Sequence, residues 1–170
     1  MNLFDGILTR RSIRSFKKKS IDDAIISDLL KAAVSAPSAG NQQPWHFIVL
    51  SDKKVLEQVS CFLPNGKMLA DADKGICVCG DLSAEKYKGY WMVDCSAATQ
   101  NILLAAHHFG IGSCWLGVYP RENRVKNLSQ FFKTPKYIVP FSVVALGYSD
   151  ELGGCVDDRL SLLRIHYNCW

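Results

Sequence analysis

The apolar runs of this sequence are of strand length and alternate with segments of helical periodicity. The run at 138–146 is far shorter than the roughly 20 residues that cross a bilayer. Strands are predicted at 45–50, 75–79, 112–118 and 138–146. Helices are predicted at 4–9, from a capping box at 20–23 to no further than 36, at 52–62, at 94–109 with Gly110 as the C′ residue, and from Pro120 to 132. The pattern indicates an α+β fold in which helices outnumber strands. At 170 residues, we expect a single domain spanning 1–170.

Charge and composition argue against nucleic-acid and membrane partners. The net charge is only +4, and the one dense basic run lies between residues 10 and 19. The N-terminus lacks the basic and then apolar pattern of a signal peptide. We therefore expect a cytoplasmic protein.

The seven cysteines do not have the spacing of a metal site or a disulfide framework. No C-x-x-C pair occurs, and the count is odd. Cys77 and Cys79 point to one face if they lie in a strand. His107 and His108 diverge by about 100° on a helix and cannot share a metal ion. We expect no metal site and mostly buried, reduced thiols.

The first segment with chemical potential lies near the N-terminus. If residues 10–16 are extended, Arg10, Ser12 and Arg14 lie on one face. Two guanidinium groups and a hydroxyl suit a dianionic phosphate. The alternative is a solvated basic terminus, although Ile13 and Phe16 favour a docked segment.

Two further segments suit a flat ligand. Residues 36–45 form a small, amide-rich loop bracketed by prolines, which offers backbone N–H groups and side-chain amides to a heterocycle. Glycines at 110, 112 and 117 allow close backbone approach. Neither a dinucleotide fingerprint nor a P-loop is present. The alternatives are a turn without a ligand for residues 36–45 and a tightly packed strand for the glycine-containing segment at 110–117.

Taken in order, these segments resemble the nitroreductase family of flavoproteins over nearly the whole chain. The resemblance rests on RRSIR at 10–14, APSAGNQQPW at 36–45, DCSAATQNILLAA at 94–106, GSCWLG at 112–117, and DRL at 158–160 with the closing residues 166–170. It implies a central, mainly antiparallel sheet flanked by helices.

The resemblance also implies roles for individual residues. The phosphate and the polar edge of FMN are assigned to Arg10, Ser12, Arg14 and Arg159, with a backbone contribution from Arg11. A homodimer is implied, with its C-terminal tail exchanged at the interface. The loop of one subunit would contact the flavin of the other through Pro37, Ser38, Ala39 and Asn41. The residues expected near the flavin N5 are Trp115, Leu116 and Gly117.

The implied activity is transfer of electrons from NADH or NADPH through FMN to a small organic acceptor such as a nitroaromatic or a quinone, with ping-pong kinetics. No catalytic side chain is assigned, because the flavin carries the chemistry. Alternatives are a flavin-binding sensor or storage protein, or a dehalogenase or flavin-consuming enzyme of the same fold. Leu116 replaces the acidic residue of larger members, and the chain has no room for their helical roof. Both differences bear on substrate identity.

Overall fold

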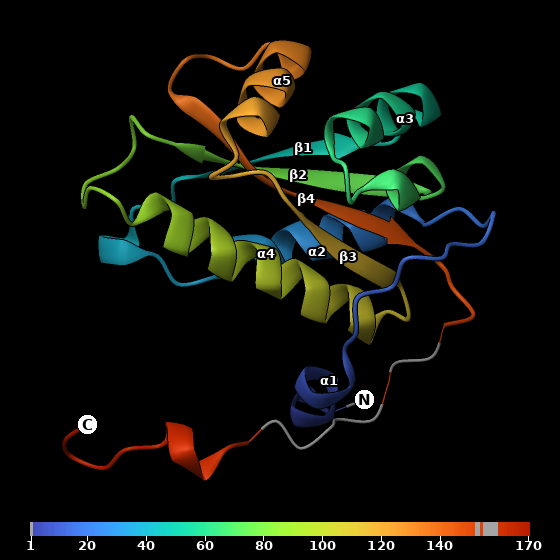
Figure 1. Cartoon of the computed structure of the whole chain (residues 1–170). Helices are drawn as coiled ribbons and strands as arrows, with labels where there is room; N and C mark the ends of the chain where they lie inside the picture. Colours follow the sequence, from blue (N-terminus) through green and yellow to red (C-terminus); the bar gives the residue numbers. More distant parts are fainter. Residues whose placement is uncertain (1, 152–153, 155–159) are drawn as a thin grey trace.

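A four-stranded antiparallel sheet forms the centre of the computed structural model, which describes residues 2–151, 154 and 160–170 (Figure 1). The strands are β1 (Trp45–Leu50), β2 (Lys74–Asp81), β3 (Gly112–Gly117) and β4 (Ile138–Gly147), in the order β1-β2-β4-β3. Every neighbouring pair is antiparallel. The predicted α+β fold with an antiparallel sheet is confirmed.

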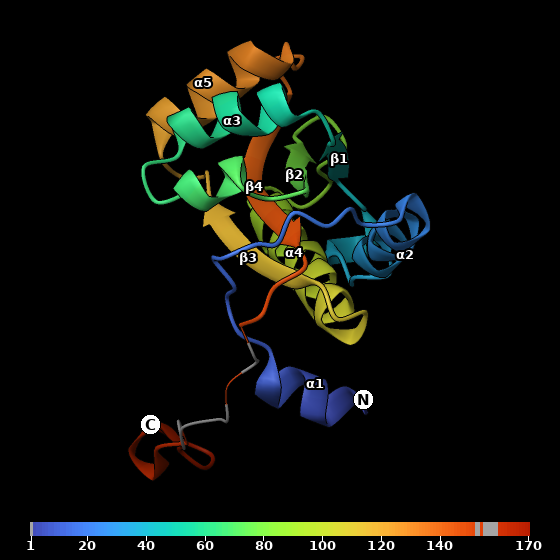
Figure 2. The ribbon, with the colours of Figure 1, turned by 90° about the vertical axis from the view of Figure 1, so that its right-hand side faces the viewer.

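Helices cover both faces of this sheet. One face carries α2 (Asp23–Val34) and α4 (Trp91–His108), and the other carries α3 (Lys53–Phe62) and α5 (Glu122–Phe132) (Figures 1 and 2). A short α1 (Leu3–Thr9) lies beyond the end of α4. Three 3₁₀ turns complete the described elements: η1 (Ala39–Asn41), η2 (Lys67–Ala70) and η3 (Leu162–Arg164). None of the helices in the described ranges could span a membrane.

The core has two halves, one on each face of the sheet. Alternate residues of β2 enter different halves, with Ile76 and Val78 on the α2/α4 side and Cys77 and Cys79 on the α3/α5 side. This double coverage explains why the sequence of β2 is apolar throughout. The Cys77 and Cys79 sulfur atoms lie 3.8 Å apart, which confirms the predicted shared face.

Most of the described thiols are buried, as expected. Four cysteines are buried, while Cys61 and Cys169 are exposed. Burial raises the pKa of the Cys95 thiol well above its ordinary value. These buried thiols therefore behave as small apolar side chains.

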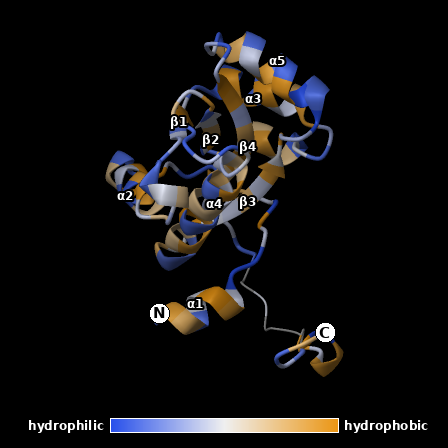
Figure 3. Cartoon of the chain, turned by 90° about the vertical axis from the view of Figure 1, so that its left-hand side faces the viewer, coloured by the Kyte–Doolittle hydropathy of each residue, from blue (hydrophilic) through white to orange (hydrophobic). Residues whose placement is uncertain are grey.

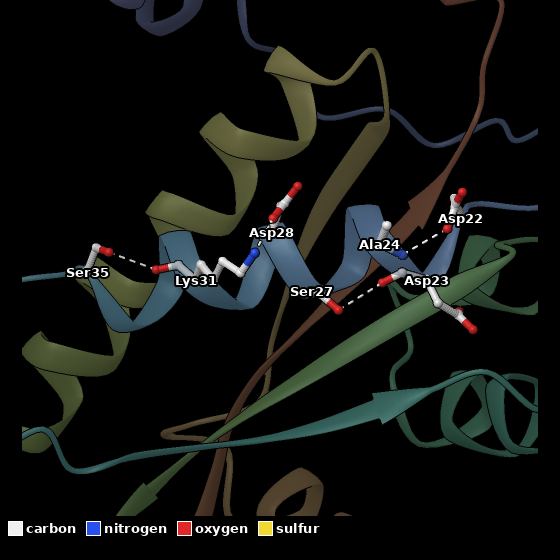
Figure 4. Close-up of polar contacts among 7 residues, drawn as sticks. All are labelled: Asp22, Asp23, Ala24, Ser27, Asp28, Lys31 and Ser35. Atoms are coloured by element: carbon white, nitrogen blue, oxygen red, sulfur yellow. Dashed lines mark hydrogen bonds and ion pairs between the residues drawn. The ribbon is translucent and has the colours of Figure 1, made fainter.

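Three predicted helix starts are wrong in detail. The N-cap of α2 is Asp22, which accepts a hydrogen bond from the Ala24 N–H at 2.9 Å, rather than Ser20 (Figure 4). Helix α4 begins at Trp91 instead of Asp94, because Glu85 accepts the Gly89 and Trp91 N–H groups. Helix α5 begins at Glu122, so Pro120 precedes the helix.

Asp94 has a structural task that its place in the sequence did not reveal. Its buried carboxylate accepts hydrogen bonds from the Ala39 N–H at 3.0 Å and from the Gln42 side-chain amide at 2.7 Å. The Gln42 oxygen in turn accepts the N–H groups of Lys86 and Tyr87. Asp94 therefore fixes the loop at 37–41 to the first turn of α4.

Replacing Asp94 with Ala should lower the free energy of unfolding by about 3 kcal/mol, because it removes two charge-assisted hydrogen bonds and leaves buried donors unpaired. Asp28→Ala is the matched control, since Asp28 pairs with Lys31 on an exposed helix face and its loss should cost less than about 1 kcal/mol. Urea denaturation measures both values. Equal losses in the two variants would contradict this role of Asp94.

Candidate functional site

The basic segment near the N-terminus docks on the outer edge of β3. Ser12 forms a parallel bridge with Ser113, and the Ile13 N–H donates to the Ser113 carbonyl at 2.9 Å. Ile13 is buried against Gly112, where a Cβ atom would lie 2.8 Å from the Ile13 side chain. The segment is therefore extended and docked, which excludes the alternative of a loose basic terminus.

A cavity of about 500 Å³ adjoins this docked segment. Arginines are the only charged side chains among the described residues that line it. The lining consists of Arg14, Leu63, Asn65, Gly66, Met68, Cys114, Trp115, Leu116, Gly117 and Arg124. Four residues predicted for the site are in this lining: Arg14, Trp115, Leu116 and Gly117.

Of the predicted phosphate-binding residues that the structure describes, Arg14 lines this cavity, whereas Arg10 and Ser12 lie in the docked segment beside it. Burial raises the pKa of the Cys114 thiol, while the charges of Arg14 and Arg10 and a hydrogen bond with Ser12 oppose the increase. Glu151 accepts the backbone N–H of Arg14 at 3.3 Å, so this carboxylate does not engage the Arg14 guanidinium through that contact.

The exposed edge of β3 supplies backbone groups to the cavity. Alternate residues of a strand direct their N–H and C=O groups to the same edge. Since Ser113 bonds outward to Ile13, Trp115 and Gly117 also present their backbone groups outward. The Arg124 Nη1 donates to the Gly117 carbonyl at 2.6 Å. Hydrogen-bonding groups on a flat strand edge suit the rim of a planar heterocycle.

Other predicted residues lie outside the cavity. The Arg11 side chain turns back to donate to the carbonyls of Leu8 and Arg10, which is compatible with a backbone role only. Arg159 lies outside the described residues.

The loop carrying Pro37, Ser38, Ala39 and Asn41 is not at the cavity of its own chain. Asp94 holds it to the first turn of α4, whereas Thr9, just before the basic segment, contacts His107 at 2.9 Å in the last turn. Asp94 and His107 are 13 positions apart, or about 20 Å along the helix. Figure 1 shows the chain that follows α2 on the left of the molecule and the segment that follows α1 on the right.

Sequence reasoning missed six residues of the cavity wall: Cys114 within β3, and Leu63, Asn65, Gly66, Met68 and Arg124 from other elements. Those from other elements come from the α3–η2 region and from α5, which reach the cavity only through tertiary packing. An arginine on an amphipathic helix gives no local signal that distinguishes it from a solvated one. Among the described residues, no cluster of His, Cys, Asp or Glu could hold a metal ion.

The sequence matches the model of the nitroreductase family over residues 7–63 and 60–148. A relative from Archaeoglobus fulgidus, provisionally named an NADH dehydrogenase/NAD(P)H nitroreductase, is 52% identical over 167 residues that cover 96% of each chain. The chain therefore belongs to the nitroreductase family.

Solved structures agree with this membership. An FMN-dependent nitroreductase from Clostridium difficile R20291 has a TM-score of 0.89 and 31% identity, covering 98% of this chain and 99% of its own. A provisionally named nitroreductase from Desulfovibrio desulfuricans, solved in complex with FMN, has a TM-score of 0.82 and 27% identity, covering 95% of this chain and 92% of its own.

The surroundings of His107 predict a pH effect on stability. Burial lowers the pKa of His107 from its ordinary value of about 6.5, and the charges of Arg10 and Arg11 lower it further. The unfolded chain then binds more protons than the folded chain just below that value, so stability is lost as the pH falls through this range.

His107→Gln should therefore reduce the drop in the free energy of unfolding between pH 7 and pH 5. Urea denaturation at several pH values measures this slope. His108→Gln, a change at the exposed neighbouring residue, should keep the parent slope. An unchanged slope in the His107 variant would show that this imidazole does not contribute to the pH dependence of the free energy of unfolding.

Proposed function

We propose that residues 1–170 form a single FMN-binding domain that transfers electrons from NADH or NADPH to a small organic acceptor such as a nitroaromatic or a quinone. The observation that carries this proposal is a cavity in which two arginines, Arg14 and Arg124, are the only charged side chains among the described lining residues, beside the docked segment that carries Arg10 and Ser12. The FMN-containing relatives support the same choice of cofactor.

The cavity residues fit FMN in both charge and shape. Arg10, Ser12 and Arg14 would hold its phosphate, together with Arg159, because guanidinium groups pair with phosphate oxygens. The outward backbone groups of Trp115 and Gly117 would bind the rim of the ring and orient it, and Leu116 lines the same wall of the cavity. When bound, FMN supplies the redox chemistry, taking hydride from a reduced nicotinamide and returning the electrons to an acceptor that follows it in the same place.

The location of the loop at 37–41 supports a site shared between two subunits. This loop, which is not in the lining of the cavity of its own chain, would complete the cavity of a partner through Pro37, Ser38, Ala39 and Asn41. We therefore propose a homodimer in which each FMN contacts both chains.

Two exposed apolar surfaces support the same assembly. The C-terminal tail extends away from the body of the molecule, with Leu163 90% and Trp170 100% exposed (Figure 3). Helix α1 exposes Leu3 and Phe4. Large apolar side chains are rarely left in water on an extended segment, and a partner subunit would cover them. We propose that this tail is exchanged at the dimer interface.

The cofactor and the activity can be tested on the purified protein. We expect flavin absorption bands, release of FMN on denaturation, and loss of the oxidised bands when NADH or NADPH is added without oxygen, with recovery on adding a quinone. Release of FAD, or no flavin after reconstitution, would refute FMN binding. Bound FMN that neither nicotinamide reduces would instead favour a flavin-binding protein without turnover.

Arg14→Ala should weaken FMN binding by about 1.5–3 kcal/mol, or roughly 10- to 150-fold, the scale of a hydrogen bond to a charged group. The fold should persist, since Arg14 is exposed and supports little core. A fluorescence titration of the apoprotein with FMN measures the affinity. Arg121→Ala, outside the cavity lining, is the control that should bind as the parent does. Parent affinity in the Arg14 variant would remove this residue from the site.

A further inference from the structure

The cavity has a second cationic end, formed by Arg124 of α5. Ser12 pairs with Ser113 near one end of β3, whereas Arg124 bonds the Gly117 carbonyl at the other end. These two β3 residues are four positions apart, or about 13 Å along an extended strand. Arg124 therefore lies at the opposite end of β3 from Ser12, so it is well placed for an anionic group other than the one assigned to Ser12.

Arg124 retains hydrogen-bonding capacity at this place. A guanidinium group carries five N–H donors, and the contact with Gly117 uses one of them. No acidic side chain of the described chain lies within ion-pair distance of Arg124. Its side chain is half-buried, and the bond to Gly117 restrains it, so little further order is lost when it binds an anion.

We infer that Arg124 is a positioning residue that binds an oxyanion carried by the substrate, and so favours anionic over neutral substrates. This inference rests on the proposed function. The single terminal phosphate of FMN is already assigned to the end at Arg10, Ser12 and Arg14. A carboxylate or phosphate near Arg124 would therefore belong to the molecule that exchanges electrons with the flavin, either an acidic acceptor or the dinucleotide donor.

Equilibrium binding to the oxidised holoprotein tests the acceptor as the source. Titrations with 4-nitrobenzoate and the neutral 4-nitrobenzyl alcohol, followed by flavin absorbance, give two dissociation constants without turnover, since no reductant is present. The parent protein should bind 4-nitrobenzoate more tightly than 4-nitrobenzyl alcohol. Arg124→Gln should weaken the binding of 4-nitrobenzoate about tenfold and leave the affinity for the neutral compound unchanged.

Flavin reduction in stopped flow tests the donor as the source. NADH carries phosphates, whereas 1-benzyl-1,4-dihydronicotinamide carries none. Arg124→Gln should slow reduction by NADH alone if the dinucleotide supplies the oxyanion. A selective loss in either the acceptor or the donor experiment supports the inference and identifies the source.

Two control variants separate a local contact from general charge or folding effects. Arg121→Gln removes the same charge from an exposed residue outside the cavity lining, and should keep the parent preference. Arg124→Lys keeps the charge and should restore most of the preference.

The inference is overturned if Arg124→Gln keeps the parent preference in both experiments, if it weakens charged and neutral ligands equally, or if Arg121→Gln has the same effect. The inference is also overturned if the parent protein favours the charged compound over the neutral one in neither experiment. Failure of the proposed electron transfer, with FMN still bound, gives a different result. The flavin then resists both donors, while the titrations with the two nitro compounds still report on Arg124.

Discussion

The site depends on one backbone interaction, the docking of an extended N-terminal segment on the outer edge of β3. The Ile13 N–H bonds the Ser113 carbonyl, and Ile13 packs where Gly112 leaves space. This contact fixes the alternation of the segment, which gives Arg10, Ser12 and Arg14 the same side and brings Arg14 into the cavity lining. A shift of one residue would turn these side chains away from the cavity. The charge of the cavity thus follows from a single strand register.

Helix α4 determines how far apart the two parts of the predicted site lie. Asp94 holds the loop at 37–41 at one end, and His107 contacts Thr9 at the other. The loop thus lies at the opposite end of the helix from Thr9, and its residues are not in the lining of the cavity of its own chain. In the proposed shared site, the loop of a second subunit completes the cavity.

Local sequence signals predicted the elements well but not their long-range contacts. The strand at 45–50 agrees with β1, because short apolar runs between turn residues have few alternatives. The predicted start of α4 was three residues too late, because Glu85 accepts the N–H groups of Gly89 and Trp91 and so lets the helix begin at Trp91. Arg124 and Asn65 reach the cavity only through tertiary packing, which no local pattern encodes. The family resemblance supplied the flavin residues, since spacing alone left alternatives open.

A mixed dimer tests the shared site most directly. One subunit carries Arg14→Ala. The other carries Asn41→Gly, which keeps the left-handed backbone of Asn41 (φ 55°) and removes its amide. Co-expression with two affinity tags isolates the mixed form, and FMN titration counts its sites of parent affinity. A shared site predicts one such site in each mixed dimer and none in either variant homodimer. A mixed dimer without any parent-affinity site, or a protein that binds FMN fully as a monomer, would contradict the account.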